Sequence, residues 1–202
     1  EERQTTVDGV TRKLPEPFIV LATQNPIGSA GTQMLPDSQM DRFMIKLGMG
    51  YPDLKSQINI LKDRHRRNPL DEINMITGRE QLIKMQEAAD AVYIADSVYE
   101  YIARLADATR RNEMIQLGIS PRGTLALCRM AKAYAFVTGR TFVIPEDVSA
   151  VFNDVCGHRI IVSPKAKIAE RKAEDILADI LRTEPVPQIR QENATGAEGK
   201  KR

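Results

Sequence analysis

Three polar residues of this chain, Asn25, Arg42 and Arg122, stand where a side chain could reach a charged ligand. Asn25 lies in the polar cluster that follows a short apolar run, 18–22. In open parallel sheets ligands sit beyond the carboxyl ends of the strands, where an amide could orient a water molecule or contact a phosphate oxygen. Arg42 precedes a second apolar run, and a guanidinium there could stabilise phosphoryl transfer from a neighbouring subunit. Arg122 lies in the first turn of a predicted helix, where free N–H groups already favour anions.

Each of the three residues also has a purely structural interpretation. Spacing alone favours a turn-forming Asn25 before Pro26, and an Arg42 that forms a surface ion pair at a helix end. For Arg122 the two interpretations weigh equally, because its charge opposes the helix dipole although a surface arginine is tolerated there. A function therefore does not follow from these positions alone.

The other titratable residues do not predict a metal site. His65 and His158 are far apart and lack nearby ligands at metal-binding spacing. Cys128 and Cys156 are too few for a disulfide framework or a zinc site, and the simplest interpretation is that both are buried, reduced thiols. The basic run 64–67 is short and lies at a predicted helix end, which indicates a solvated helix terminus rather than a nucleic-acid patch.

The first fifty residues predict part of an α/β structure. Asp8-Gly9 stands between β-formers, which is typical of a two-residue hairpin turn. The apolar run 18–22 predicts a strand buried on both faces of a parallel sheet. A short helix is expected over 36–41, and a second strand over 43–47.

From Pro52 onward the pattern is helical. Capping residues and apolar spacings of three and four predict helices that begin near Asp53, Thr77, Asp96, Ser120, Pro145 and Ala173. Residues 188–202 are polar and charged and are expected to be disordered. The expected fold class is an α/β remnant, with a hairpin and about two parallel-sheet strands, followed by an all-α domain, so that the chain is predominantly α.

The composition agrees with a soluble globular protein. The 202 residues are 42% hydrophobic and 28% charged, with a net charge of +2, which argues against wholesale disorder and against a dedicated nucleic-acid binder. The longest strongly apolar run, 18–22, is far shorter than the ~20 residues of a membrane span. The chain begins at Glu1 without a methionine, so we expect it to be cut from a longer protein.

Several motifs closely resemble the MoxR family of AAA+ ATPases. The first two are Ala22-Thr23-Gln24-Asn25-Pro26 and the block LPDSQMDRF from Leu35 to Phe43, followed by Gly50-Tyr51-Pro52 at the family's spacing. Further matches are Ser120-Pro121-Arg122, Pro145-Glu146-Asp147-Val148, His158-Arg159-Ile160 and Pro185-Val186-Pro187. Together they cover almost the whole chain up to about residue 187.

The resemblance implies a role for each of the three polar residues. Asn25 falls on sensor 1, which contacts the γ-phosphate or the attacking water, and Arg122 falls on sensor 2, which reaches from the lid to the phosphates, so both would bind nucleotide. Arg42 falls on the arginine finger, which enters the ATP site of the adjacent subunit. The hairpin around Asp8-Gly9 resembles the insertion before sensor 1 that this family shares with magnesium chelatase and MCM-type motors.

The resemblance also implies what the chain lacks. No G-x-x-x-x-G-K-[ST] loop and no acidic Walker B cluster occur in it. Both, with the Mg²⁺ ligands, should lie upstream in this family. Residues 1–51 would then be the C-terminal part of the AAA+ core, 52–184 the helical lid and 185–202 a flexible tail. This chain alone would be inactive.

The complete protein is expected to hydrolyse ATP with Mg²⁺ in a homo-oligomeric ring, expected to be a hexamer, in the cytoplasm. It would remodel or mature partner proteins, von Willebrand A domain proteins among them, and neither nucleic-acid binding nor a membrane span is expected. Two alternatives stay open. One is an AAA+ motor similar to MCM or magnesium chelatase, for example an MCM-like helicase that acts on DNA, and the other is a non-enzymatic helical interaction module.

Overall fold

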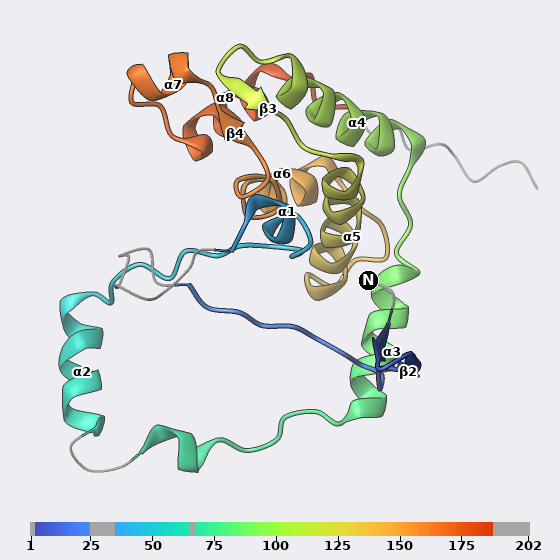
Figure 1. The fold of residues 1–202 in the computed structure, drawn as a ribbon, viewed down its shortest axis with the longest axis vertical. Helices are drawn as coiled ribbons and strands as arrows, with labels where there is room; N and C mark the ends of the chain where they lie inside the picture. Colours follow the sequence, from blue (N-terminus) through green and yellow to red (C-terminus); the bar gives the residue numbers. More distant parts are fainter. Residues whose placement is uncertain (1–2, 25–34, 65–67, 188–202) are drawn as a thin grey trace, which may run out of the picture.

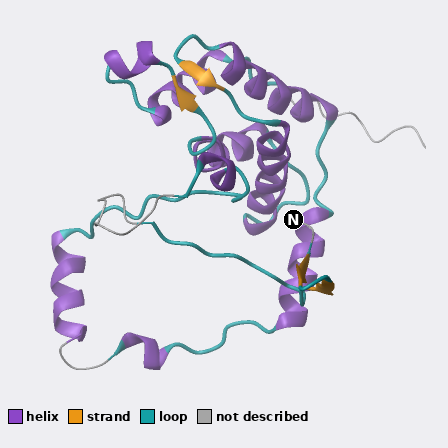
Figure 2. Cartoon of the chain, viewed as in Figure 1, coloured by secondary structure: helices purple, strands orange, loops and turns teal. Residues whose placement is uncertain are grey.

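A computed structural model of the chain describes residues 3–24, 35–64 and 68–187. The described elements are mostly helices (Figure 2), which confirms the predominantly α fold class. In chain order they are β1 (Gln4–Val7), β2 (Val10–Lys13), α1 (Asp37–Met40), α2 (Leu54–Arg64), the 3-10 helix η1 (Pro69–Glu72), α3 (Arg79–Asp90), α4 (Asp96–Arg111), β3 (Ile115–Leu117), α5 (Pro121–Val137), α6 (Pro145–Cys156), β4 (Ile161–Val162), α7 (Pro164–Ile168) and α8 (Ala173–Thr183).

The hydrophobic core lies among α4, α5, α6 and α8 (Figure 1). α5 and α6 form the most extensive helix pair, and α3 packs against the outside of α5. Each helix of the core contributes large side chains with almost no exposed surface, such as Tyr101, Leu127, Phe152 and Leu177. Burying a side chain of this size stabilises the fold by about 1.5–3 kcal/mol, so this helical bundle is the stable part of the chain.

Local signals located the start of α5 correctly. Ser120 is the N-cap, and its Oγ accepts the N–H of Gly123 at 3.2 Å, with Pro121 in the first helical position. The start of α3 differs from the prediction, because the helix begins at Arg79 and Gly78 is its N-cap, without a side-chain cap. Thr77 therefore does not cap α3.

A second two-stranded antiparallel sheet, formed by β3 and β4 on either side of α5 and α6 in the chain, was not predicted. Ile115 pairs with Val162 and Leu117 with Ile161, with an irregularity between the two pairs. Strands of two and three residues are too short to show an alternating pattern, so the sequence carries no periodic signal for them.

The predicted hairpin at the start of the chain is confirmed. β1 and β2 pair antiparallel from Gln4 with Lys13 to Val7 with Val10. The two turn residues, Asp8 and Gly9, have φ angles of +52° and +76°, which is the left-handed conformation that a two-residue turn of this kind requires.

The two predicted parallel-sheet strands are not formed. Residues 18–22 and 43–47 have no strand conformation, and Leu21 is 93% exposed. A strand needs a neighbour that pairs with its N–H and C=O groups, and no described segment lies beside either run in a sheet. The backbone of the second run bonds to the bundle instead, since the N–H of Lys46 donates to the carbonyl of Asp154 at 3.0 Å.

α2 and η1 lie apart from the helical bundle, joined to it by extended chain (Figure 1). The apolar residues of α2 are correspondingly open, with Leu54 75%, Ile58 42% and Leu61 68% exposed. The division of the chain at residue 52 stays a prediction.

Candidate functional site

Two of the three predicted site residues fall in the described part of the chain. Arg42 is the second residue after α1 and is exposed, and Arg122 is in the first turn of α5 with its side chain 44% exposed. Asn25 lies outside the described residues. The candidate site is therefore built from the two arginines and the groups that hold them.

The carboxylate of Asp41 connects the arginine-bearing segments. It accepts the Ser120 hydroxyl at 3.2 Å, an Nη1–H of Arg122 at 3.3 Å and the Nε–H of Arg159 at 3.2 Å. Ser120 and Arg122 lie 79 and 81 residues along the chain from Asp41. Because Arg42 is the residue after Asp41, the contact brings the two predicted functional arginines close together in space.

The short helix α1 sets the directions of Asp41 and Arg42. Asp41 N–H donates to the carbonyl of Asp37 at 2.9 Å, and Arg42 N–H to that of Gln39 at 3.1 Å. The half-buried Asp41 side chain turns toward the bundle, whereas the Arg42 side chain makes no hydrogen bond or ion pair with any other described residue. Arg42 thus presents its guanidinium to the outside of the chain.

An acidic side chain lies at the N-terminus of α5, where the helix dipole favours negative charge. Pro121 has no N–H, and the N–H groups of Gly123 and Thr124 donate to Ser120. The Asp41 carboxylate is therefore held there by the Ser120 hydroxyl and the Arg122 guanidinium.

Burial lowers the pKa values of Arg159, which binds the Asp41 carboxylate, and of its neighbour His158. Burial lowers the pKa of Arg159, and the Asp41 charge opposes this shift. Burial also lowers the pKa of His158, the nearby charge of Arg159 adding to the effect, while a hydrogen bond to the carbonyl of Phe43 opposes it. Near neutral pH His158 is therefore uncharged, and Arg159 remains the buried cation at this end of α6.

The arrangement suits the stabilisation of transferring phosphoryl groups. Guanidinium groups match phosphate geometry through their fixed fork of N–H donors. A guanidinium aimed at a phosphoryl group can neutralise the charge that develops as the group moves. Neither Arg42 nor Arg122 is buried, so both can reach a ligand.

The described residues do not fit a metal site. They contain no group of three His, Cys, Asp or Glu side chains that could hold a metal ion, and the acidic Asp41 is already committed to its hydrogen-bond donors. Of the two cysteines, Cys156 is buried as expected and burial raises its pKa to about 12, whereas Cys128 is only partly buried.

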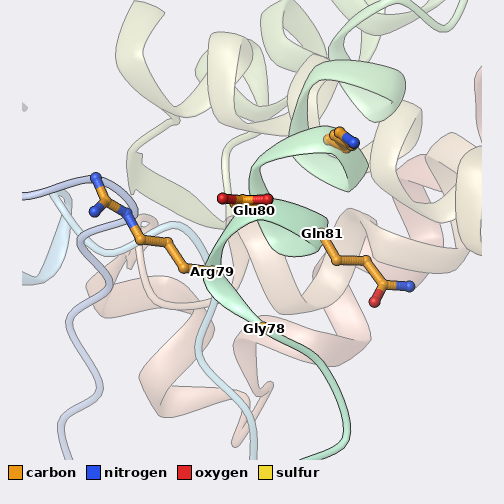
Figure 3. Close-up of a pocket in the computed structure, with 5 residues that line it drawn as sticks. Gly78, Arg79, Glu80 and Gln81 are labelled. Atoms are coloured by element: carbon orange, nitrogen blue, oxygen red, sulfur yellow. The ribbon is translucent and has the colours of Figure 1, made fainter.

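A surface pocket at the start of α3 is not the candidate site. It is lined by Gly78, Arg79, Glu80, Gln81 and Lys84, and the side chains of Arg79 and Gln81 point away from each other (Figure 3). The Nε–H of Arg79 donates to the carbonyl of Glu16. The polar groups do not converge on a ligand position, and none of the candidate arginines takes part.

Sequence reasoning missed two residues of the site, Asp41 and Arg159. Both stood inside quoted motifs, Asp41-Arg42-Phe43 and His158-Arg159-Ile160. The available signal was a charged residue beside apolar ones in a motif that the resemblance had singled out. The pairing of two residues 118 positions apart has no local signature.

Two family models match separate parts of the chain. Residues 1–45 match the family model described as ATPase family associated with various cellular activities (AAA), and residues 107–180 match the AAA lid domain. The chain is 38% identical to the uncharacterized protein YeaC of Bacillus subtilis over 93% of the chain, and 33% identical to chaperone MoxR1 of Mycobacterium tuberculosis over 94%. It spans 58% and 52% of the lengths of these two relatives.

A solved structure shows the same fold. The crystal structure of a protein from Cytophaga hutchinsonii that was assigned as an ATPase superposes with a TM-score of 0.83 and 32% identity, over 93% of this chain and 59% of that one. The fold and the two matched domains define the class as an AAA+ ATPase with a helical lid. Within that class, the chain belongs to the MoxR family.

Proposed function

We propose that this chain supplies the arginine finger, sensor 1 and the helical lid of a MoxR-type ATPase that hydrolyses ATP in an oligomeric ring. The observation that carries the proposal is the exposed guanidinium of Arg42, which makes no hydrogen bond or ion pair with any other described residue and follows an Asp41 that is bonded to Arg122. The AAA family matches support the same reaction class.

In this proposal ATP lies at the interface between two subunits. Arg42 enters the neighbouring subunit's site, Arg122 contacts the phosphates from the lid of its own subunit, and Asn25 helps to position the attacking water. Arg122 must then exchange the Asp41 carboxylate for a phosphate oxygen when ATP binds. Mg²⁺ supplies further charge neutralisation when bound, and its ligands are not among the described residues of this chain.

The lid would convert hydrolysis into work on protein clients. We place the protein in the chaperone-like, hexameric part of this class, with von Willebrand A domain proteins as the expected partners. The free cysteines support a reducing, cytoplasmic setting. Among the described residues, none of the helices combines the length and the apolar character needed to cross a membrane.

Replacement of Arg42 tests the proposal. In the complete subunit, Arg42→Ala should lower kcat by at least about 10³-fold, since an arginine finger contributes 10³–10⁵, while ATP binding stays near the wild-type level. Steady-state ATPase assays and nucleotide titration measure the two quantities. Arg12→Ala is the matched control, because Arg12 is an exposed arginine of β2 and should leave turnover unchanged. Near-normal turnover by Arg42→Ala would refute the finger assignment.

The β1–β2 hairpin bears on the DNA-motor alternative. Its tip carries Asp8 and Gly9, and the basic Arg12 and Lys13 lie further along β2. A hairpin that contacts DNA should carry cations at its tip to neutralise phosphates, so the geometry favours protein clients. Salt-dependent binding of the complete ring to DNA would reverse this preference, and a complete subunit without ATPase activity would favour the interaction module.

A further inference from the structure

Arg159, three residues after the end of α6, uses all of its hydrogen-bonding capacity. Its side chain is only 1% exposed. Nε donates to the Asp41 carboxylate at 3.2 Å, Nη1 to the carbonyls of Met44 (3.1 Å) and Val155, and Nη2 to those of Asp41 (3.2 Å) and Phe43. A guanidinium has five N–H groups, and here each has an acceptor.

Most of these bonds go to the chain around Arg42. Four of the five acceptors belong to residues 41–44, on both sides of Arg42 in the sequence. We call residues 41–46 the finger segment. Two further contacts hold it, from His158 Nε2 to the carbonyl of Phe43 (3.2 Å) and from Lys46 N–H to the carbonyl of Asp154 (3.0 Å). The end of α6 therefore sets the path of the backbone through Arg42.

Gly123 in α5 makes room for the guanidinium. A Cβ at Gly123 would lie 2.8 Å from Cδ of Arg159, closer than carbon atoms approach in folded proteins. Glycine inside a helix is less favourable than alanine, so the helix bears a local cost at the place where Arg159 passes. The position of the Arg159 side chain therefore depends on the absence of a side chain at Gly123.

We propose that Arg159 is a positioning residue that fastens the finger segment to the helical bundle and so sets where Arg42 stands relative to the neighbouring subunit's nucleotide. This inference rests on the proposed role of Arg42. Arg159 belongs to the helical bundle, which is the lid in the proposed function. The finger segment therefore moves with the lid, and a rotation of the lid displaces Arg42 from the phosphates of the neighbouring subunit's ATP. The contact thereby couples the lid of one subunit to hydrolysis in the next.

Hydrogen exchange of the Lys46 amide in this chain tests the fastening. Arg159→Lys keeps the charge but replaces the fork of five donors by a single ammonium. We expect exchange at Lys46 to accelerate by at least about tenfold, because local opening exposes amides whose bonds depend on the lost contacts. Gly123→Ala should do the same by displacing the guanidinium. Thermal unfolding shows whether each variant keeps the folded bundle.

The matched control for Arg159→Lys is Arg140→Lys. Arg140 also binds a carboxylate, that of Asp147, but it does not touch the finger segment. Exchange at Lys46 should be unchanged in this variant. Unchanged Lys46 exchange in both Arg159→Lys and Gly123→Ala, or equal acceleration in Arg140→Lys, would overturn the fastening.

ATPase kinetics of the complete subunit test the coupling to Arg42. Arg159→Lys should lower kcat by about tenfold or more with KM for ATP within about twofold, as expected when only the transition state loses a contact. Arg42→Ala combined with Arg159→Lys should be no slower than Arg42→Ala alone, because one residue acts through the other. Additive losses would overturn the positioning role.

The two proposals fail in different ways. A wild-type complete subunit that hydrolyses no ATP would refute the proposed function, and the Lys46 exchange experiment would still decide the fastening. A wild-type ATPase whose Arg159→Lys variant keeps its kcat would refute the positioning role alone.

Discussion

Asp41 accepts hydrogen bonds from three side chains that come from different parts of the fold. Ser120 caps α5, Arg122 lies in its first turn and Arg159 follows α6. An ionised carboxylate has two oxygens with about four acceptor positions, so one residue can hold all three. At the residue scale the site is therefore an arrangement of cations around one acid, with Arg42 left outside it.

His158 gives this site a pH dependence. Its pKa is lowered, first by burial and then by the charges of Arg159 and Lys46, and its Nε2 contacts the carbonyl of Phe43. The unfolded chain therefore takes up a proton at about pH 6.5 before the folded one does. The stability that neutral His158 contributes is complete above this pH and is lost as the pH falls through the lower, folded pKa.

We accordingly expect a different acid response in His158→Gln. Between pH 7.5 and 5, the free energy of unfolding of the wild type should decline more steeply than that of the variant, which carries no titrating group at this position. Urea titrations at several pH values measure both curves. Other groups that titrate in this range are common to the two proteins, so parallel curves would show that His158 is not the group responsible.

The turn between α5 and α6 is held by hydrogen bonds to both helices. Gly139 has a φ of +80°, and Arg140 N–H donates to the carbonyl of Ala135 at 2.8 Å, as at many helix C-termini. Arg140 then reaches Asp147, which is 1% exposed and also accepts the N–H of Ile144 at 2.9 Å. One buried acid thus caps α6 and holds the preceding turn.

Asp147→Ala should destabilise the bundle strongly. The change removes the cap of α6 and leaves Arg140 without its carboxylate, a combination that costs about 3 kcal/mol in the free energy of unfolding. Urea denaturation measures it. Glu146→Ala, an exposed acid in the same helical turn, should stay within about 0.5 kcal/mol of the wild type. A loss below about 1 kcal/mol for Asp147→Ala would contradict the capping role.

At the scale of the whole molecule, the chain has one compact bundle and an open N-terminal part. The apolar residues 18–21 are all more than half exposed, and the described residues hold no strand that covers them. The finger segment bridges the two parts, since it follows the open region and binds the end of α6. Arg42 thus stands at the border between the bundle and the ATPase-core sequence.

We expect the chain alone to bind nucleotide weakly. The 202 residues contain no G-x-x-x-x-G-K-[ST] loop, so the backbone cradle that holds the β- and γ-phosphates is not formed from them. Calorimetry with Mg-ATP should show no binding tighter than about 1 mM and no hydrolysis. A dissociation constant in the low micromolar range would contradict the prediction.

The sequence by itself determined the features that depend on neighbouring residues. The hairpin at Asp8-Gly9, the cap at Ser120 and the helical pattern after Pro52 follow from backbone preferences and short spacings, and the structure confirms them. The motif wording also identified the family. The runs 18–22 and 43–47 were wrongly assigned to strands, because apolar character shows that a segment seeks burial and does not show whether a partner strand is present.

Only the tertiary structure decided how the site is assembled. Asp41 meets Arg122 across 81 residues and Arg159 across 118, and no local pattern encodes contacts at such separations. They form because the packing of α5 against α6 brings the start of one helix and the end of the other to the same place. There a single carboxylate pairs with two arginines, one of them a buried cation that would be costly without an acid beside it.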